Sequence, residues 1–230
     1  MVTNDRDVTT TLRNVEDLAF NDFVKGLLVR SGASPEGVDT IFDKPALDSV
    51  FFESNPHVDW RNKPLSYFCE RIIRTQLISR ERLSTFQASV LERIHGRLTI
   101  DTIPPEVVVN ESIDGKVISL HAWARHTILE AMTMSLYGES FLEIDPTFLN
   151  TFHRFDSESW KLTFKIPSMF AKEMLMGKRQ LQHTFDKYYE TSASQRADAC
   201  WMSKSLEAEL RAEGHSTKDV STYLLLLYWV

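Results

Sequence analysis

Histidine and cysteine are the residues of this sequence best suited to bind a metal ion, and their spacing argues against such a site. The seven histidines lie at positions 57, 95, 121, 126, 153, 183 and 215. His121 and His126 are close in sequence, but five helical steps separate their directions by roughly 140°. No Cys-x-x-Cys pair is present, and neither cysteine has a histidine within four residues. The sequence therefore predicts no zinc site.

The sequence also shows no motif for nucleophilic or acid–base catalysis. Cys69 and Cys200 each lie in a segment with a helical pattern, so we expect two reduced thiols rather than a disulfide. No Gly-x-Ser-x-Gly, phosphate-binding loop or Gly-x-Gly-x-x-Gly occurs. His126 and Glu130 are four residues apart and could share a hydrogen bond, which we interpret as structural. The sequence thus predicts no catalytic, cofactor-binding or metal-binding residue.

The charge balance argues against some classes of partner. The formal net charge is −6 and the pI is about 5.7, which is unlike a nucleic-acid-binding protein. Arg71, Arg74, Arg80 and Arg82 form a basic cluster that is typical of a solvated face, although it could dock an acidic partner. The first seven residues contain no apolar run, so we expect an intracellular chain without a signal peptide or membrane anchor.

Apolar spacings of three and four predict a mainly α fold, organised as one domain over residues 1–230. Ser79 is expected to cap a helix that is buried through Leu83, Phe86, Val90 and Ile94. The apolar run 223–230 is too short to span a bilayer, which takes about 20 residues, and is interpreted as a buried helix. The segment after Pro64 presents one apolar helical face, made of Leu65, Phe68, Cys69, Ile72, Ile73 and Leu77.

The middle of the chain shows a different pattern. Valine-rich runs flank the pair Asp114-Gly115, which predicts a small β-hairpin near residues 106–119. A helix is expected from about Leu120 to Tyr137, with Gly138 ending it. Its apolar positions nearly encircle it, and its polar exceptions form a single stripe, made of His126, Glu130 and Thr133.

Further helices are expected in the second half. Asp145-Pro146 supplies a cap and a first-turn proline, and a further amphipathic helix spans residues 200–212. Ser216 and Asp219 predict a capping-box start for the terminal helix. Pro167 opens another helix, whose inward face is expected to contain Phe170, Met174, Leu181, Phe185 and Tyr188.

Several of these segments resemble one protein family. The run from Trp123 to Gly138, with Asp145-Pro146 and Phe155-Asp156 after it, resembles the central helices of fungal cytochromes P450. The resemblance is to the branch of sterol 7-alpha-hydroxylase-like and prostacyclin-synthase-like enzymes. Residues 18–23 resemble the turn after the family's second helix, and residues 32–38 resemble the Gly-x-Ser-x-x-Gly-Val run that follows this turn. Residues 64–77 would then be the haem-flanking helix, and residues 221–230 the start of the long central helix.

The resemblance implies a partial P450 fold, from the second helix to the start of the central helix. Intact relatives of this kind insert oxygen into an apolar metabolite, sterol or lipid, using haem iron and a reductase at the endoplasmic reticulum membrane. The 230 residues lack the family's haem-ligand cysteine motif, its Glu-x-x-Arg pair and its acid–threonine pair. We therefore expect a chain truncated at both ends, catalytically inactive and without haem of its own.

A non-enzymatic helical interaction module is the alternative. In that interpretation the apolar run 223–230 and the arginine cluster would be partner-binding surfaces.

Overall fold

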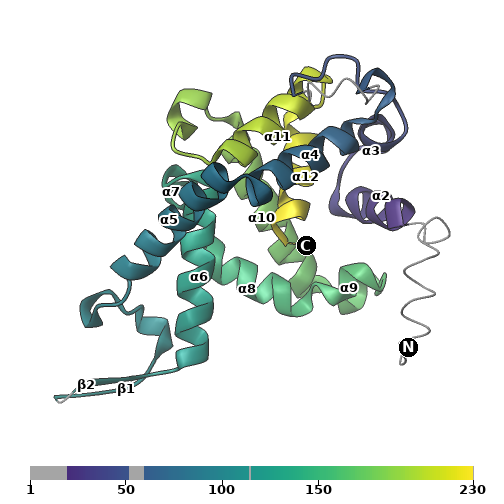
Figure 1. The fold of residues 1–230 in the computed structure, drawn as a ribbon. Helices are drawn as coiled ribbons and strands as arrows, with labels where there is room; N and C mark the ends of the chain where they lie inside the picture. Colours follow the sequence, from purple (N-terminus) through teal and green to yellow (C-terminus); the bar gives the residue numbers. More distant parts are fainter. Residues whose placement is uncertain (1–19, 52–59, 114, 230) are drawn as a thin grey trace, which may run out of the picture.

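The described chain is mainly helical, as predicted, with one small antiparallel sheet (Figure 1). The structure is a computed structural model and describes residues 20–51, 60–113 and 115–229. The α-helices are α2 (Phe20–Ser31), α3 (Pro35–Phe42), α4 (Leu65–Ile78), α5 (Arg80–Gly96), α6 (Leu120–Tyr137), α7 (Ser140–Ile144), α8 (Phe148–Glu158), α9 (Trp160–Thr163), α10 (Lys172–Glu190), α11 (Trp201–Ala212) and α12 (Thr217–Trp229). The 3-10 helices are Trp60–Asn62, Ile100–Thr102, Pro105–Val107, Ser168–Phe170 and Ala193–Arg196.

The hairpin is confirmed and joins α5 to α6. Strand β1 (Val108–Ser112) pairs with β2 (Gly115–Ile118), with Val108 opposite Ile118 and an irregular register before Asn110. Asp114, the first residue of the predicted turn pair, lies outside the described residues. The hairpin projects from the end of α6 away from the other helices (Figure 1).

Helix α12 runs through the middle of the fold (Figure 1) and packs against α10, α2 and α11. Its residues from Val220 to Leu226 are all buried, which confirms the buried terminal helix that the apolar run predicts. The same burial means that Leu224, Leu225 and Leu226 form core and not a surface for a partner. Val230 lies outside the described residues.

A cluster of aromatic rings joins five helices at the centre of the core. The Tyr137 and Phe141 centroids are 4.9 Å apart, and those of Phe141 and Phe148 are 4.8 Å apart. Phe185 on α10 and Tyr228 on α12 add rings to the same cluster. Stacked and edge-to-face contacts of this kind contribute about 0.5–1.5 kcal/mol each beyond the burial of apolar surface. The cluster therefore fixes the C-terminal end of α6 against α7, α8, α10 and α12.

The predicted cap at the start of α12 is confirmed, and it is linked to a second cap at the start of α3. The Ser216 side-chain oxygen accepts a hydrogen bond from the Asp219 amide at 3.1 Å. Asp219 Oδ1 in turn accepts from the Ser34 amide at 2.8 Å, while Ser34 Oγ accepts from the Gly37 amide at 3.0 Å. One carboxylate therefore ties the start of α12 to the start of α3, although the two lie far apart in the sequence.

Two of the predicted helix faces are wrong in part. Leu77 is 53% exposed, although Leu65, Phe68, Cys69 and Ile72 on the same helix are buried. Helix α5 has no buried residue: the side chains predicted to be buried, from Leu83 to Ile94, are only half-buried. The reason is that α5 packs mainly against α4 and α6 and leaves its other side open to solvent.

Two proline-marked helix starts are shifted. After Asp145-Pro146 the helix begins at Phe148, and Asp145 Oδ1 accepts hydrogen bonds from the Thr147 amide and hydroxyl. After Pro167 the chain makes a 3-10 turn before α10 begins at Lys172. Phe170 belongs to that turn and is 68% exposed, so its predicted inward position is wrong.

Gly138 is the predicted end of α6 and has a φ of 85°, which favours glycine. A Cβ there would collide with the carboxylate of Asp198, which accepts a hydrogen bond from the Glu139 amide at 2.8 Å. We expect Gly138→Ala to lower the free energy of unfolding by about 1–3 kcal/mol, measured by chemical denaturation. Gly96→Ala is the control, because a Cβ there meets nothing within 4 Å, and it should be neutral or slightly stabilising.

Candidate functional site

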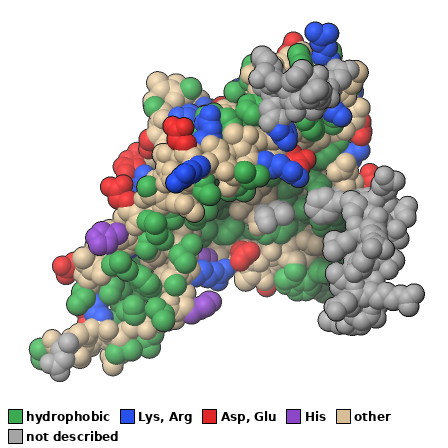
Figure 2. All heavy atoms as spheres, in the orientation of Figure 1, with side chains coloured by type: hydrophobic (Ala, Val, Ile, Leu, Met, Phe, Trp, Pro, Cys, Tyr) green, Lys and Arg blue, Asp and Glu red, His purple; other side chains and the backbone are tan. Residues whose placement is uncertain are grey.

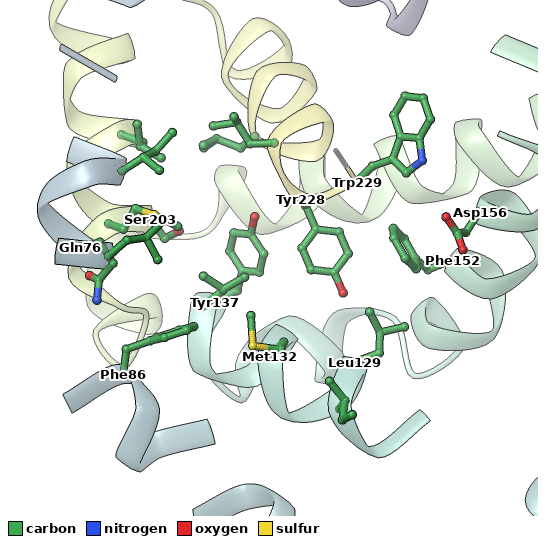
Figure 3. A pocket seen from close by; sticks show the side chains of 18 of the residues that line it. Gln76, Phe86, Leu129, Met132, Tyr137, Phe152, Asp156, Ser203, Tyr228 and Trp229 are labelled. Carbon is green, nitrogen blue, oxygen red and sulfur yellow. The ribbon is translucent and has the colours of Figure 1, made fainter. Parts of the chain in front are cut away.

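An apolar cavity of about 600 Å³ lies between α4, α5, α6, α8, α11 and α12 (Figure 3). Its volume is within the range of about 300–1,000 Å³ that is typical of small-molecule sites. Most of its walls are aliphatic or aromatic, and the lining residues are Ile73, Gln76, Leu77, Phe86, Arg125, Ile128, Leu129, Met132, Leu136, Tyr137, Phe152, His153, Asp156, Met202, Ser203, Leu206, Leu224, Leu227, Tyr228 and Trp229.

Two tyrosines stand side by side within this cavity, and their hydroxyls differ (Figure 3). Tyr228 reaches from α12 to α6, where its hydroxyl lies 2.5 Å from Thr133 Oγ1. Thr133 donates its own proton to the Leu129 carbonyl oxygen at 2.6 Å, so Tyr228 is the donor of this pair. The buried Thr133 is therefore fully engaged, which explains how a polar residue of the predicted stripe is accommodated inside the core.

Tyr137 is only 4% exposed, yet no hydrogen bond from the described residues reaches its hydroxyl. Its backbone carbonyl accepts from the Tyr188 hydroxyl at 2.5 Å, and its ring packs against Phe141, Phe185 and Tyr188. Burial raises the pKa of Tyr137 well above its usual value, so the phenol keeps its proton. A fixed and protonated hydroxyl without a protein partner thus faces the cavity.

One end of the cavity carries polar side chains from α6 and α8. Arg125 Nη2 and Asp156 Oδ2 are 3.0 Å apart, which balances the two charges. Burial, together with the nearby Arg125 and His126 side chains, lowers the pKa of His153 to about 4. His153 is therefore neutral at pH 7, and its buried Nδ1 has no hydrogen-bond partner among the described residues. This end carries no net charge near neutral pH.

The polar side chains at the opposite end are already in use. Gln76 is buried on α4 and donates from Nε2 to the Arg82 carbonyl oxygen at 3.0 Å. The Ser203 hydroxyl lies 3.4 Å from that of Tyr189. Arg82 stacks 3.8 Å above the Trp201 ring, and Arg74 pairs with Glu70, so these members of the arginine cluster make contacts within the chain.

The two cysteines do not fit the role of a haem ligand. Cys69 lies on the buried face of α4, where burial raises its pKa to about 12. Cys200 occupies the N-cap position of α11, where its Sγ accepts from the Ser203 amide, and burial raises its pKa as well. A haem-thiolate site needs a cysteine that is deprotonated and open to the iron. Within the described residues, no group of three or more His, Cys, Asp or Glu side chains could hold a metal ion.

The site differs from what the sequence suggests at several positions. The carboxylate of Glu130 binds Arg97 at 2.5 Å, whereas His126 lies beside the His153 ring with the centroids 6.4 Å apart. The expectation that Glu130 has a structural role holds with this different partner. The unpartnered hydroxyl of Tyr137 and the Arg125–Asp156 pair were not anticipated. A tyrosine in the last turn of an apolar helix carries no signal of its own, because the same residue is common in ordinary cores.

Two further findings concern membrane-spanning helices and similarity to known proteins. Along the described residues, no helix has both the length and the apolar composition that crossing a membrane requires. Protein-family models, curated proteins and solved structures were all compared with the chain, and none matches it.

Proposed function

We propose that this chain is a cytochrome P450-like helical scaffold that binds an apolar small molecule and contributes no haem ligand of its own. The observation that carries the proposal is the apolar cavity of about 600 Å³ that six helices line. Its size and lining are those of a small-molecule site and exceed the voids of an ordinary packed core.

The sequence resemblance supports the same assignment. The segments that resemble the family's haem-flanking helix, its central helices and the start of its long central helix correspond to α4, α6 and α12. All three contribute walls to the cavity. Intact relatives insert oxygen into an apolar metabolite, sterol or lipid, with electrons from a reductase. In this proposal the chain supplies pocket walls for such a molecule, and its residues perform no step of the oxidation.

Binding of Nile red, a neutral dye that fluoresces in apolar surroundings, tests the cavity directly. We expect saturable binding to the full chain, and Met132→Trp should weaken it at least tenfold because the indole would fill the space beside Tyr228 (Figure 3). Met176→Trp is the matched control, because Met176 is exposed on α10 and should leave binding unchanged. Equal binding by both variants would contradict the proposal, provided that circular dichroism shows both to be folded.

A second measurement tests the absence of a haem ligand. The purified chain is mixed with haem, reduced and exposed to carbon monoxide, and its absorption spectrum is recorded. We expect no red-shifted Soret band, because neither Cys69 nor Cys200 offers a thiolate. A band at the thiolate position, lost in Cys69→Ser or Cys200→Ser, would show that a cysteine binds iron and that this part of the proposal is wrong.

A non-enzymatic interaction module remains the second candidate, and one observation favours it. Apolar side chains gather on the molecular surface at the hairpin end (Figure 2), where Val109, Ile113, Val117 and Leu120 are all exposed. Such a patch is typical of a contact surface. If Val109→Lys and Val117→Lys abolished association with a protein partner while dye binding persisted, the hairpin would have a function separate from the cavity.

A further inference from the structure

We propose that the Tyr137 hydroxyl is the anchor of the cavity and donates a hydrogen bond to an oxygen atom of a neutral, otherwise apolar ligand. This inference rests on the proposed function, since it concerns the ligand of the same cavity. It narrows that ligand to a molecule with a carbonyl, ether or hydroxyl oxygen on a hydrocarbon skeleton.

Tyr137 has unused hydrogen-bonding capacity. The residue is only 4% exposed, and no hydrogen bond from the described residues reaches its hydroxyl, so the group is free to bond with a molecule in the cavity that it lines. Tyr228, which stands beside Tyr137 in the cavity, has its hydroxyl satisfied by Thr133. The cavity thus holds one hydroxyl that is occupied and one that is open (Figure 3).

The ring of Tyr137 is held in place before any ligand binds. Phe141 stacks on it at 4.9 Å, while Phe185 and Tyr188 meet it edge-on at 5.3 Å and 5.7 Å. A donor fixed in this way loses little conformational entropy when it forms a bond, which favours ligand recognition. The phenol is also a donor at any pH near neutrality, because burial disfavours its ionised form.

The charges that line the cavity favour a neutral ligand. Among the lining residues, the charged side chains are Arg125 and Asp156, and these are paired with each other. His153 is uncharged at pH 7, and the Gln76 and Ser203 side chains already have partners. A carboxylate in the cavity would lose its hydration without gaining a cation, which is strongly unfavourable. An uncharged oxygen needs only the one bond that Tyr137 offers.

The experiment compares three ligands that share one rigid skeleton. They are 5α-androstane, its 17-ketone and its 17β-carboxylic acid, each used to displace Nile red from the full-length chain. We expect the hydrocarbon and the ketone to displace the dye and the acid to compete poorly. Tyr137→Phe should weaken the ketone about three- to tenfold, as expected for one buried hydrogen bond, and should leave the hydrocarbon unchanged.

Tyr228→Phe is the matched control, because its lost hydroxyl already belongs to Thr133. This variant should affect the ketone and the hydrocarbon equally. The infrared carbonyl band of the bound ketone gives a second readout with the unmodified protein. It should lie at lower frequency than in a hydrocarbon solvent, and the shift should disappear in Tyr137→Phe.

The outcomes separate this inference from the function on which it rests. If neither androstane nor its ketone displaced the dye, the cavity would not be a ligand site. Both the proposed function and the role of Tyr137 would then be wrong. If both bound but Tyr137→Phe weakened them equally, or left the ketone unaffected, the proposed hydrogen bond from Tyr137 would be wrong. The cavity would still be a ligand site. Tighter binding of the acid than of the ketone would overturn the choice of a neutral ligand.

Discussion

Glu207→Gln should destabilise the fold by about 3 kcal/mol, at the lower end of the cost of breaking a buried ion pair. Arg196 is only 5% exposed, and both of its terminal nitrogens bind the Glu207 carboxylate, at 2.5 Å and 2.9 Å. Arg211 donates from Nε to the same carboxylate at 2.8 Å. A glutamine side chain has one acceptor oxygen and no charge, so it would leave the buried Arg196 guanidinium without compensation. Urea-induced unfolding measures the effect.

An exposed ion pair on α4 provides the control for this prediction. Arg74 and Glu70 are 2.6 Å apart, but both side chains are more than half exposed. Glu70→Gln should therefore change the free energy of unfolding by less than about 0.5 kcal/mol. Equal effects of the two substitutions would mean that burial of the Arg196 pair contributes nothing, which would contradict the prediction.

The same carboxylate predicts a dependence of stability on pH. Burial works to raise the pKa of Glu207, but the hydrogen bonds from Arg196 and Arg211 outweigh it and hold the pKa below its usual value. A lowered folded-state pKa means stabilisation that is complete above the unfolded-state pKa of about 4.5 and is lost as the pH falls below it. Glu207→Gln should remove this part of the acid destabilisation, so the difference in stability between the two proteins should shrink as the pH is lowered through this window.

Local signals in the sequence predicted the local structure well. The hairpin, the Ser216–Asp219 box, and Gly138 at the end of α6 each depend on a few neighbouring residues, and each is observed. The mainly helical fold follows from the apolar spacings for the same reason. Apolar spacing, however, marks only a face suited to packing, and it does not say whether a neighbour covers that face. Helix α5 shows the difference, since its apolar side chains remain half-buried.

The candidate site could not be read from the sequence, because its properties arise from residues far apart along the chain. Whether the Tyr137 hydroxyl has a partner depends on which side chains surround it. Its neighbour in the cavity, Tyr228, lies near the C-terminal end of the described chain. His153 is neutral because it is buried and because Arg125 and His126 of another helix lie beside it, and both effects lower its pKa. A list of residue types contains neither fact. The sequence could exclude metal-binding and nucleophile motifs, but a cavity is a property of packing.

Phe170 and Phe185 show most clearly how packing decides the role of a residue, and they give the second large prediction. Both were expected on the inward face of one helix, yet Phe185 is fully buried and Phe170 is 68% exposed. Phe185→Ala should lower the free energy of unfolding by about 3–5 kcal/mol, the usual cost of deleting a buried ring. Phe170→Ala is the same chemical change fifteen positions away and should cost less than about 0.5 kcal/mol. Similar effects of the two substitutions would show that the core does not have the arrangement described.

Phe185→Ala should also weaken ligand binding, although Phe185 does not line the cavity. Its ring meets Tyr137 at 5.3 Å and Tyr228 at 6.0 Å, and these two tyrosines form adjacent parts of the cavity wall. Without the ring behind them, both tyrosines would gain rotational freedom, and a ligand would have to restrict it again. We therefore expect Nile red affinity to fall in Phe185→Ala under conditions where the variant is still folded, while Phe170→Ala binds normally. Unchanged affinity in a folded Phe185→Ala protein would mean that the aromatic cluster stabilises the fold without positioning the site.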